Sequence, residues 1–405
     1  MNAPHSLTQS LGSWELPEEL RMLRDTTRRF MDKEVKPAEA DEPHDSYSLP
    51  DAKLLPLQAK AKALGLWCVQ SPVEYGGAGL NLLGQCIVAE ESVKCKMGAY
   101  IAACGAFGFD PPNIIFKGRR DQIEKYALPV IQNGEKTFVA ITEPSGGSDP
   151  GRAIRTRADL KSTRADKKGD RYILNGTKIF ISGVGQSKWG IVFARTGGPG
   201  RSGVSAFIVE RDKPGLRWSP FPVIRSYYPY ELSFEDYEVP AENMLGEEGK
   251  GFSFAEEWLV HERAPYAAAT IGLGQAALEL AIEWATQRET FGARLADRQA
   301  IQWQLADSEI ELRAARLLVY EAAWQADRGE DSKLAASVAK VYGTETAGRV
   351  VDRCIQIFGG MGVSKEMPLE RWYRELRIKR IGEGPSEVHR MVVARHLLGG
   401  RRDRS

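Results

Sequence analysis

The stretch TFVAITEPSGGSDP, residues 137–150, marks the point at which the character of the sequence changes. Before it, from Pro17 to about Lys136, the chain reads as a series of helices separated by breakers. The stretch itself begins with a β-branched and aromatic run and ends in small polar residues, as a strand followed by a turn does. Such a turn is either a capped surface loop, with Glu143 and Asp149 binding backbone N–H groups, or a cradle for phosphate or ring oxygens.

Strand-like runs rich in β-branched and aromatic residues continue from this stretch to about Pro240. Within them the pair Asn175-Gly176 predicts a hairpin turn, because both central residues of a type I′ turn need positive φ. Several short strands joined by turns are typical of an antiparallel barrel or sandwich.

Beyond the glycine-rich break GEEGKG, residues 246–251, apolar residues recur with helical spacing. One predicted helix has an apolar face made by Leu273, Ala277, Leu280 and Trp284. A second, longer helix has a face made by Leu305, Ser308, Leu312, Ala315 and Val319, as in an antiparallel bundle. We therefore expect an α+β fold of three domains. These are an N-terminal helical domain over residues 1–136, a middle antiparallel β-barrel or sandwich domain over 137–246, and a C-terminal antiparallel bundle of four-helix type over 247–405.

The composition argues against several classes of protein. The 405 residues carry a formal net charge of +1, so electrostatics give no reason to expect nucleic acid or a membrane surface as a partner. The five cysteines lack C-x-x-C spacing and the five histidines lack metal-ligand spacing, so we expect neither a disulfide framework nor a metal site. No secretory signal and no membrane-spanning run is visible, and we expect a cytoplasmic protein.

Glu383 is the candidate catalytic residue, within RIGEGPSEVHR at residues 380–390. Its flanking glycines leave room for a ligand, and a carboxylate in a water-poor pocket has a raised pKa that suits a base near neutral pH. Alternatively, Glu383 is a solvated glutamate in a loop. Glu387 is either part of the site or a negative charge that the helix dipole favours at a helix N-terminus. Three further polar residues near helix ends either bind a ligand or are ordinary helix-end residues: Arg288, Gln299 and Gln356.

Taken together and in this order, these segments resemble the acyl-CoA dehydrogenase family over almost the whole chain. The segments that carry the resemblance are PVEYGGAGL (72–80), AITEPSGGSD (140–149), YILNGTKIFISG (172–183), ELSFEDYEVPAENMLGEEGKGF (231–252), QRETFG (287–292), QIFGGMG (356–362) and GEG (382–384). The resemblance implies FAD bound between the β-domain and the bundle. It also implies a homo-oligomer, usually a tetramer, in which a neighbouring subunit completes the FAD site.

The resemblance assigns roles to individual residues. It implies FAD contacts from Ile141, Thr142, Gly147, Ser148, Phe180, Ser182, Pro385 and Glu387. It implies contacts to the FAD of a partner subunit from Arg288, Thr290, Phe291, Gln299, Gln356 and Gly360. It implies substrate contacts from Ser148, Arg263, Gly384 and Arg395.

By the same resemblance, Glu383 removes the α-proton of an acyl-CoA thioester in lipid or carboxylic acid catabolism, the β-hydride passes to the flavin, and an electron-transfer flavoprotein takes the electrons. Glu262, directly before Arg263, is the alternative base, because a minority of the family place the base there. Gly382 and Pro385 replace the frequent tyrosine and threonine, which favours a pocket widened for branched or ring-bearing acyl groups.

Two other functions remain open at this point: a flavin oxidase or monooxygenase on the same fold, and a partner subunit of a mixed tetramer. The intact Glu383 speaks against a non-enzymatic subunit. In IRSYYPYEL, residues 224–232, the side chains Arg225, Tyr227, Tyr228 and Tyr230 suggest a polar or aromatic acyl group, or else tyrosines packed on the β-domain surface.

Overall fold

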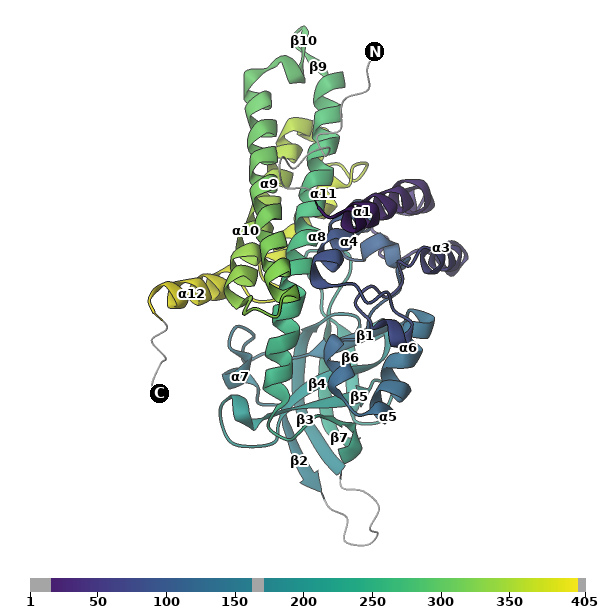
Figure 1. The fold of residues 1–405 in the computed structure, drawn as a ribbon, viewed down its shortest axis with the longest axis vertical. Helices are drawn as coiled ribbons and strands as arrows, with labels where there is room; N and C mark the ends of the chain where they lie inside the picture. Colours follow the sequence, from purple (N-terminus) through teal and green to yellow (C-terminus); the bar gives the residue numbers. More distant parts are fainter. Residues whose placement is uncertain (1–15, 162–170, 400–405) are drawn as a thin grey trace.

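The computed structural model describes residues 16–161 and 171–399, so the N-terminal segment 1–15 lies outside the described residues. Figure 1 shows a long helical bundle at one end, a β-sheet domain at the other and shorter N-terminal helices along one side. The order along the chain is helical, β and helical again. The α+β fold class predicted from the sequence is therefore confirmed.

Short helices make up the N-terminal part of the chain. They are α1 (Glu18–Phe30), α2 (Lys36–Glu39), α3 (Asp51–Ala63), α4 (Leu82–Ser92), α5 (Arg120–Gln122) and α6 (Leu128–Asn133). The helix α4 crosses the bundle helix α8 (Gly251–Gln287) at close range. A Cβ atom at Gly272 of α8 would lie 2.0 Å from the carbonyl oxygen of Glu90, so only glycine permits this approach.

The middle of the chain forms an eight-stranded sheet with the order β6-β7-β3-β2-β4-β5-β8, and β1 pairs with β4. The strands are β1 (Lys136–Ala140), β2 (Arg157–Lys161), β3 (Arg171–Ile181), β4 (Ser187–Arg195), β5 (Val204–Glu210), β6 (Leu216–Pro220), β7 (Tyr230–Pro240) and β8 (Met244–Leu245). Most neighbours are antiparallel, but β1 runs parallel to β4, as does β2 where it meets β4, so the sheet is mixed.

The hairpin predicted at Asn175-Gly176 is wrong. Both residues lie inside β3, and the pairing with β7 shifts register between Leu174 and Gly176. Gly176 has a φ of 145°, and a Cβ there would lie 2.5 Å from Thr156 Oγ1. The Asn175 side chain accepts a hydrogen bond from the backbone N–H of Asp236 on β7. The pair therefore forms a β-bulge, which, like a type I′ turn, accommodates a glycine with positive φ.

The sheet has two apolar faces that pack into different cores. In β4, Ile191 and Phe193 face a cluster shared with the segment 114–130 and the start of α8. The intervening Val192 and Ala194 face the opposite cluster, which lies between the strands themselves and includes Phe138. This period of two is what a strand buried on both faces requires.

The C-terminal part is a bundle built on three long helices, α8, α9 (Gln299–Asp327) and α10 (Lys333–Phe358). A two-stranded hairpin, β9 (Glu289–Thr290) and β10 (Ala293–Arg294), joins α8 to α9 at the end of the bundle remote from the sheet (Figure 1). The helices α11 (Leu369–Lys379) and α12 (Ser386–Leu397) follow, and α12 projects away from the bundle (Figure 1). Four members of the predicted stripe on α9 are buried: Ser308, Leu312, Ala315 and Val319.

Across the described ranges 16–161 and 171–399, the structure contains no helix with the length and apolar character that crossing a bilayer demands.

Candidate active site

Glu383 lies in the loop between α11 and α12, in a backbone conformation that side chains rarely adopt. Its φ is 54° and that of Gly384 is 96°, both in the left-handed region. Two buried side chains hold this loop: Lys340 Nζ donates to the Gly384 carbonyl at 2.6 Å, and His389 Nε2 donates to the Glu383 carbonyl at 3.0 Å. A strained conformation persists only where such contacts over-determine it, which makes this loop a functional-site candidate.

The carboxylate of Glu383 is surrounded by cations but is not fully hydrogen-bonded. Its Oε2 atom is buried and has no hydrogen-bond partner among the described residues. Burial raises the pKa of Glu383, while the charges of Arg263, Lys379 and Lys340 oppose the rise. Arg263 Nε is also buried, and no residue that the structure describes accepts a hydrogen bond from it. The group thus combines a desolvated carboxyl group with a ring of positive charge that favours its ionised form.

Glu262, from the middle of α8, lies close enough to Glu383 for their charges to interact. Burial first, and then the charges of Glu383 and Asp110, raise the pKa of Glu262 from 4.5 to about 8. Only a hydrogen bond from Gln70 opposes this rise. Two neighbouring carboxyl groups therefore differ in their surroundings: Glu383 faces cations and Glu262 does not. At neutral pH Glu262 carries the proton.

Gly382, which precedes Glu383, packs against Tyr266 of α8. A Cβ atom at residue 382 would lie 2.5 Å from the Tyr266 hydroxyl oxygen. The Tyr266 side chain thus fills the space that a larger residue at position 382 would need. This contact accounts for a glycine at the position where the sequence resemblance implies a frequent tyrosine.

The loop that follows β1 is anchored by a buried ion pair. Lys178 Nζ lies 2.7 Å from Glu143 Oε1, and the Glu143 carboxylate also accepts the backbone N–H groups of Arg155 and Thr156. Glu143 thus has the structural role that the sequence left open. Beyond it, Gly147 and Ser148 are exposed, and a Cβ at Gly147 would lie 2.9 Å from Thr142 Cγ2. The anchored loop therefore presents small groups and backbone to a ligand.

The end of β3 lies beside a charged and aromatic group of residues. Phe180 has a φ of 59° and is half exposed, and Ser182 is exposed. The Ser182 hydroxyl oxygen lies 3.4 Å from Arg225 Nη2. Arg225 and Tyr227, two of the residues suggested for the acyl end, are therefore brought to the end of β3. Tyr228 is exposed and Tyr230 is partly buried.

A second set of predicted residues gathers at the remote end of the bundle. Stacking of Trp284 on Phe358, with ring centroids 4.8 Å apart, joins the ends of α8 and α10 there. The members are Arg288, Thr290, Phe291, Gln299, Gln356 and Gly360, on or beside the β9–β10 hairpin and the ends of α8, α9 and α10 (Figure 1). Phe291 is fully exposed with a φ of 50°. Within one chain this set does not meet Glu383.

Three predicted residues lie on or beside α12. Pro385 directly precedes the helix, and Glu387 is exposed in its first turn. Arg395 is exposed near the far end of the helix, which projects from the bundle (Figure 1). Of the predicted substrate contacts, Arg263 and Gly384 therefore join Glu383, whereas Arg395 does not in a single chain.

Sequence reasoning missed the residues that support the site from buried positions. Lys340 and Lys178 are completely buried, as is His389, and each holds a loop named above. Burial lowers the pKa of His389 to about 4, so its ring is neutral and its Nε2–H can donate to the Glu383 carbonyl. A buried lysine within a helix has the same sequence pattern as an exposed one, so no signal in the sequence identifies it.

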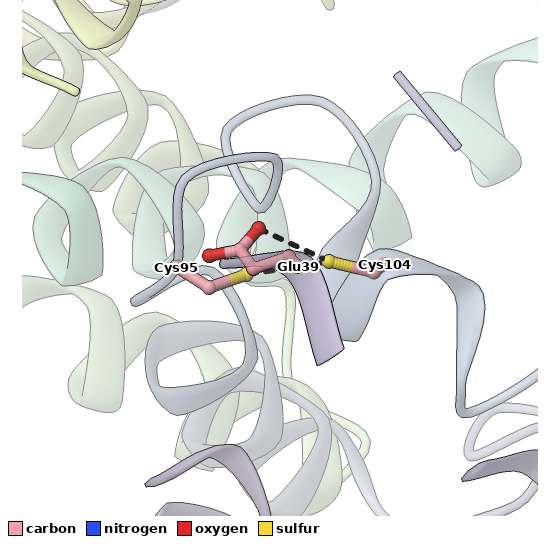
Figure 2. Close-up of side chains that lie close together, drawn as sticks. All are labelled: Glu39, Cys95 and Cys104. Carbon is pink, nitrogen blue, oxygen red and sulfur yellow. Dashed lines mark hydrogen bonds between the residues drawn. The ribbon is translucent and has the colours of Figure 1, made fainter. Parts of the chain in front are cut away.

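Figure 2 shows one other cluster of chemically reactive side chains, Glu39, Cys95 and Cys104. The Cys104 thiol donates to Glu39 Oε2 at 3.4 Å and lies 3.8 Å from Cys95 Sγ. The Glu39 carboxylate also accepts the backbone N–H groups of Lys96 and Met97. Hydrogen bonding to Cys95 and burial raise the pKa of Cys104, so the thiol stays protonated. These contacts anchor the loop after α4 to the N-terminal helices.

Comparison with known proteins gives a consistent picture. Family models of the acyl-CoA dehydrogenase N-terminal, middle and C-terminal domains match residues 17–135, 133–237 and 249–398. The mitochondrial short-chain specific acyl-CoA dehydrogenase of Mus musculus is 38% identical over 97% of this chain and 93% of its own length. The structure of butyryl-CoA dehydrogenase from Megasphaera elsdenii is 32% identical with a TM-score of 0.82, over 95% of this chain and 99% of that one. An FAD complex of PigA is 25% identical with a TM-score of 0.83, over 96% and 100%.

Proposed function

The chain belongs to the acyl-CoA dehydrogenase family, and from that premise we propose that it oxidises an acyl-CoA thioester between its α and β carbons with Glu383 as the base. Membership makes it an oxidoreductase. The observation that carries the choice of base is the buried Oε2 atom of Glu383, which lies within a ring of three cations and has no hydrogen-bond partner in the described part of the chain.

The surroundings of the two carboxyl groups favour Glu383 over Glu262. A base must be ionised before it can take a proton, and Arg263, Lys340 and Lys379 stabilise the ionised form of Glu383. Glu262 has no such cation and a pKa of about 8, so it is largely protonated at neutral pH. The α-proton would pass to Glu383, and burial prevents its loss to water before the product leaves.

The backbone around the base supports a second role. Neither the Glu383 nor the Gly384 backbone N–H donates a hydrogen bond to another described residue. An N–H group held beside the base can stabilise negative charge that develops on the thioester oxygen as the α-proton leaves. The contacts of Lys340 and His389 with the two carbonyls fix the orientation of this segment. We include Gly384, Arg263, Ser148 and Arg395 as substrate contacts.

FAD fits the residues that the chain presents. When bound, FAD supplies the acceptor for the β-hydrogen, which leaves as hydride. The anchored loop with Thr142, Gly147 and Ser148 offers the small groups and close backbone that a dinucleotide cofactor needs. We propose that this loop, together with Ile141, Phe180, Ser182, Pro385 and Glu387, holds the FAD, and that an electron-transfer flavoprotein accepts the electrons.

The residues at the remote end of the bundle require a second copy of the chain to take part. Phe291 is fully exposed at the turn of the β9–β10 hairpin, where its ring is accessible to a partner subunit. On α9 four large exposed apolar residues recur every seven positions: Trp303, Ile310, Leu317 and Trp324. A stripe of this period is typical of a helix that packs against another helix. We propose a homo-oligomer, built as a tetramer, in which a neighbour's FAD is contacted by Arg288, Thr290, Phe291, Gln299, Gln356 and Gly360.

The experiment is anaerobic mixing of the purified protein with short-chain acyl-CoA thioesters. We expect the protein to carry FAD and a thioester to bleach its visible absorbance, with formation of the 2-enoyl-CoA. A protein that carries FAD, binds no CoA thioester and is rapidly reoxidised by oxygen would instead be an oxidase or monooxygenase. A protein that turns over only after addition of another subunit would belong to a mixed assembly.

A further inference from the structure

A second charged group lies next to the base, at the junction of the three parts of the chain. Arg225, in the loop before β7, lies 3.6 Å from the Glu375 carboxylate of α11 and 3.4 Å from the Ser182 hydroxyl. Its guanidinium lies over the ring of Tyr100, 4.6 Å from the centroid, and Tyr100 stacks on Tyr227 with 3.9 Å between centroids. The Arg225 and Glu375 side chains are only 10% and 2% exposed.

Lys379 and Tyr266 connect this group to Glu383. The Lys379 ammonium lies 4.1 Å from the centroid of the Tyr266 ring, and it interacts electrostatically with Glu375 and Glu383. The Tyr266 hydroxyl packs against Gly382, the residue directly before the base. We call Arg225, Glu375, Lys379, Tyr100 and Tyr266 the distal cluster. It therefore starts at the base and extends towards Ser182.

The hydrogen bonds within the distal cluster are incomplete. Arg225 Nε and Glu375 Oε2 are buried without a hydrogen-bond partner among the described residues, and 3.6 Å is too long for a hydrogen bond between the two side chains. Within the same described ranges, Lys379 Nζ makes no hydrogen bond or ion pair, only the ring contact. If this buried ion pair served only the fold, we would expect its donors and acceptors to be hydrogen-bonded, because each buried group without a hydrogen bond lowers stability.

The charges are also unmatched. Four cations, Arg263, Lys340, Lys379 and Arg225, face only two carboxylates, those of Glu383 and Glu375. Burial lowers the pKa of Lys379 to about 8, so it is still mainly charged at neutral pH. An alkyl chain placed against Arg225 and Lys379 would remove water from them and return no hydrogen bond. A carboxylate would supply both the missing acceptor and the missing charge.

We propose that the distal cluster binds the far end of the acyl group and that this end carries a carboxylate. The substrate class is then the CoA monothioester of a short dicarboxylic acid. This inference rests on the proposed function and narrows it. Arg225 and Lys379 would take the carboxylate, and the Tyr100 and Tyr266 rings would line the chain between it and the reacting carbons.

The experiment compares thioesters of equal chain length with and without the terminal carboxylate. Glutaryl-CoA is set against valeryl-CoA and adipyl-CoA against hexanoyl-CoA, and anaerobic flavin reduction by the holoenzyme gives kcat/KM for each. Binding is measured separately by calorimetry on Glu383→Gln, in which turnover should be at least about 100-fold slower. We expect at least one carboxylate-ended thioester to exceed its neutral partner by roughly 10- to 100-fold in both measurements, as a charged hydrogen bond is worth.

Variants test whether the cluster causes the preference. Arg225→Met should lower the ratio of carboxylate-ended to neutral kcat/KM by roughly 10- to 100-fold, and Arg225→Lys should restore part of it. Arg217→Met, at a side chain 74% exposed on β6, is the matched control and should leave the ratio unchanged. If Arg225→Met does not fold, Glu375→Gln provides the test, since removing the competing carboxylate should tighten binding of the carboxylate-ended thioester.

The failures of the two proposals are distinguishable. If valeryl-CoA and hexanoyl-CoA reduce the flavin with the same kcat/KM as their carboxylate-ended partners, the proposed function stands and the distal cluster has another role. If the wild-type preference exists but Arg225→Met and Glu375→Gln leave it unchanged, the carboxylate is bound elsewhere. If no thioester reduces the flavin, the proposed function itself fails.

Discussion

Replacing Glu262 by glutamine should remove a pH-dependent loss of stability. The pKa of Glu262 is raised from 4.5 to about 8 in the folded protein, mainly by burial and then by the charge of Glu383. The folded state therefore holds this proton more tightly than the unfolded state. Its contribution to stability is fully present below pH 4.5 and is lost as the pH rises towards about 8. Glutamine is neutral at every pH, so the variant should lose less stability over this range.

The size of the effect follows from the shift. At about 1.4 kcal/mol per pKa unit the full shift corresponds to roughly 5 kcal/mol, which is an upper figure because relaxation and water entry reduce it. We expect the free energy of unfolding of the variant, relative to that of the wild type, to increase by at least about 1 kcal/mol from pH 5 to pH 9. For 405 residues, 1 kcal/mol corresponds to about 1 °C in Tm, so the Tm difference should grow by roughly 1–5 °C.

Thermal unfolding of both proteins across this pH range is the assay, with Glu279→Gln as the matched control. Glu279 is exposed on the same helix, α8, and its substitution should not alter the pH dependence. A Tm difference that is constant from pH 5 to pH 9 would refute the reasoning, because it would mean that Glu262 is already ionised at low pH.

Two further predictions concern the loop after β1 and the surface of α9. Glu143→Gln should leave Lys178 buried without its counter-charge, which destabilises by about 3–5 kcal/mol, and should weaken FAD retention. Thermal unfolding and the FAD content after gel filtration measure both effects, and a variant as stable as the wild type would contradict the expected role of the ion pair. Trp303→Glu combined with Ile310→Glu should lower the molar mass in light scattering, because both exposed residues belong to the apolar stripe, whereas Glu321→Gln on the same helix should not. An unchanged molar mass in the double variant would exclude the stripe as an interface.

The fold could be predicted from the sequence because the spacing of apolar residues along each helix or strand reports which face is buried. The stripe from Ser308 to Val319 reports the buried face of α9 directly, since helical spacing and burial are coupled. The pair Asn175-Gly176 failed for the opposite reason. Positive φ suits a hairpin turn and a β-bulge equally, and the approach of Thr156 that decides between them is a tertiary contact. The limits of the three domains proposed at residues 136 and 246 stay a prediction.

The sequence predicted the base of the candidate site but not the groups that surround it. The glycine-flanked Glu383 is visible in the sequence, whereas the groups that tune it come from distant segments, such as Lys340 on α10 and Arg263 on α8. The choice between Glu383 and Glu262 depends on which carboxylate faces cations, and spacing along the chain does not contain that information. The distal cluster likewise joins Tyr100, Arg225 and Lys379 from three parts of the chain.

The identity of the base is tested most directly by single-turnover flavin reduction in two variants that both keep FAD. We predict that Glu383→Gln slows reduction by an acyl-CoA thioester by at least about 100-fold, while its binding persists. Glu262→Gln should stay within about tenfold of the wild type, because that carboxyl is already protonated at neutral pH. Reduction at the wild-type rate in Glu383→Gln, together with its loss in Glu262→Gln, would contradict the account.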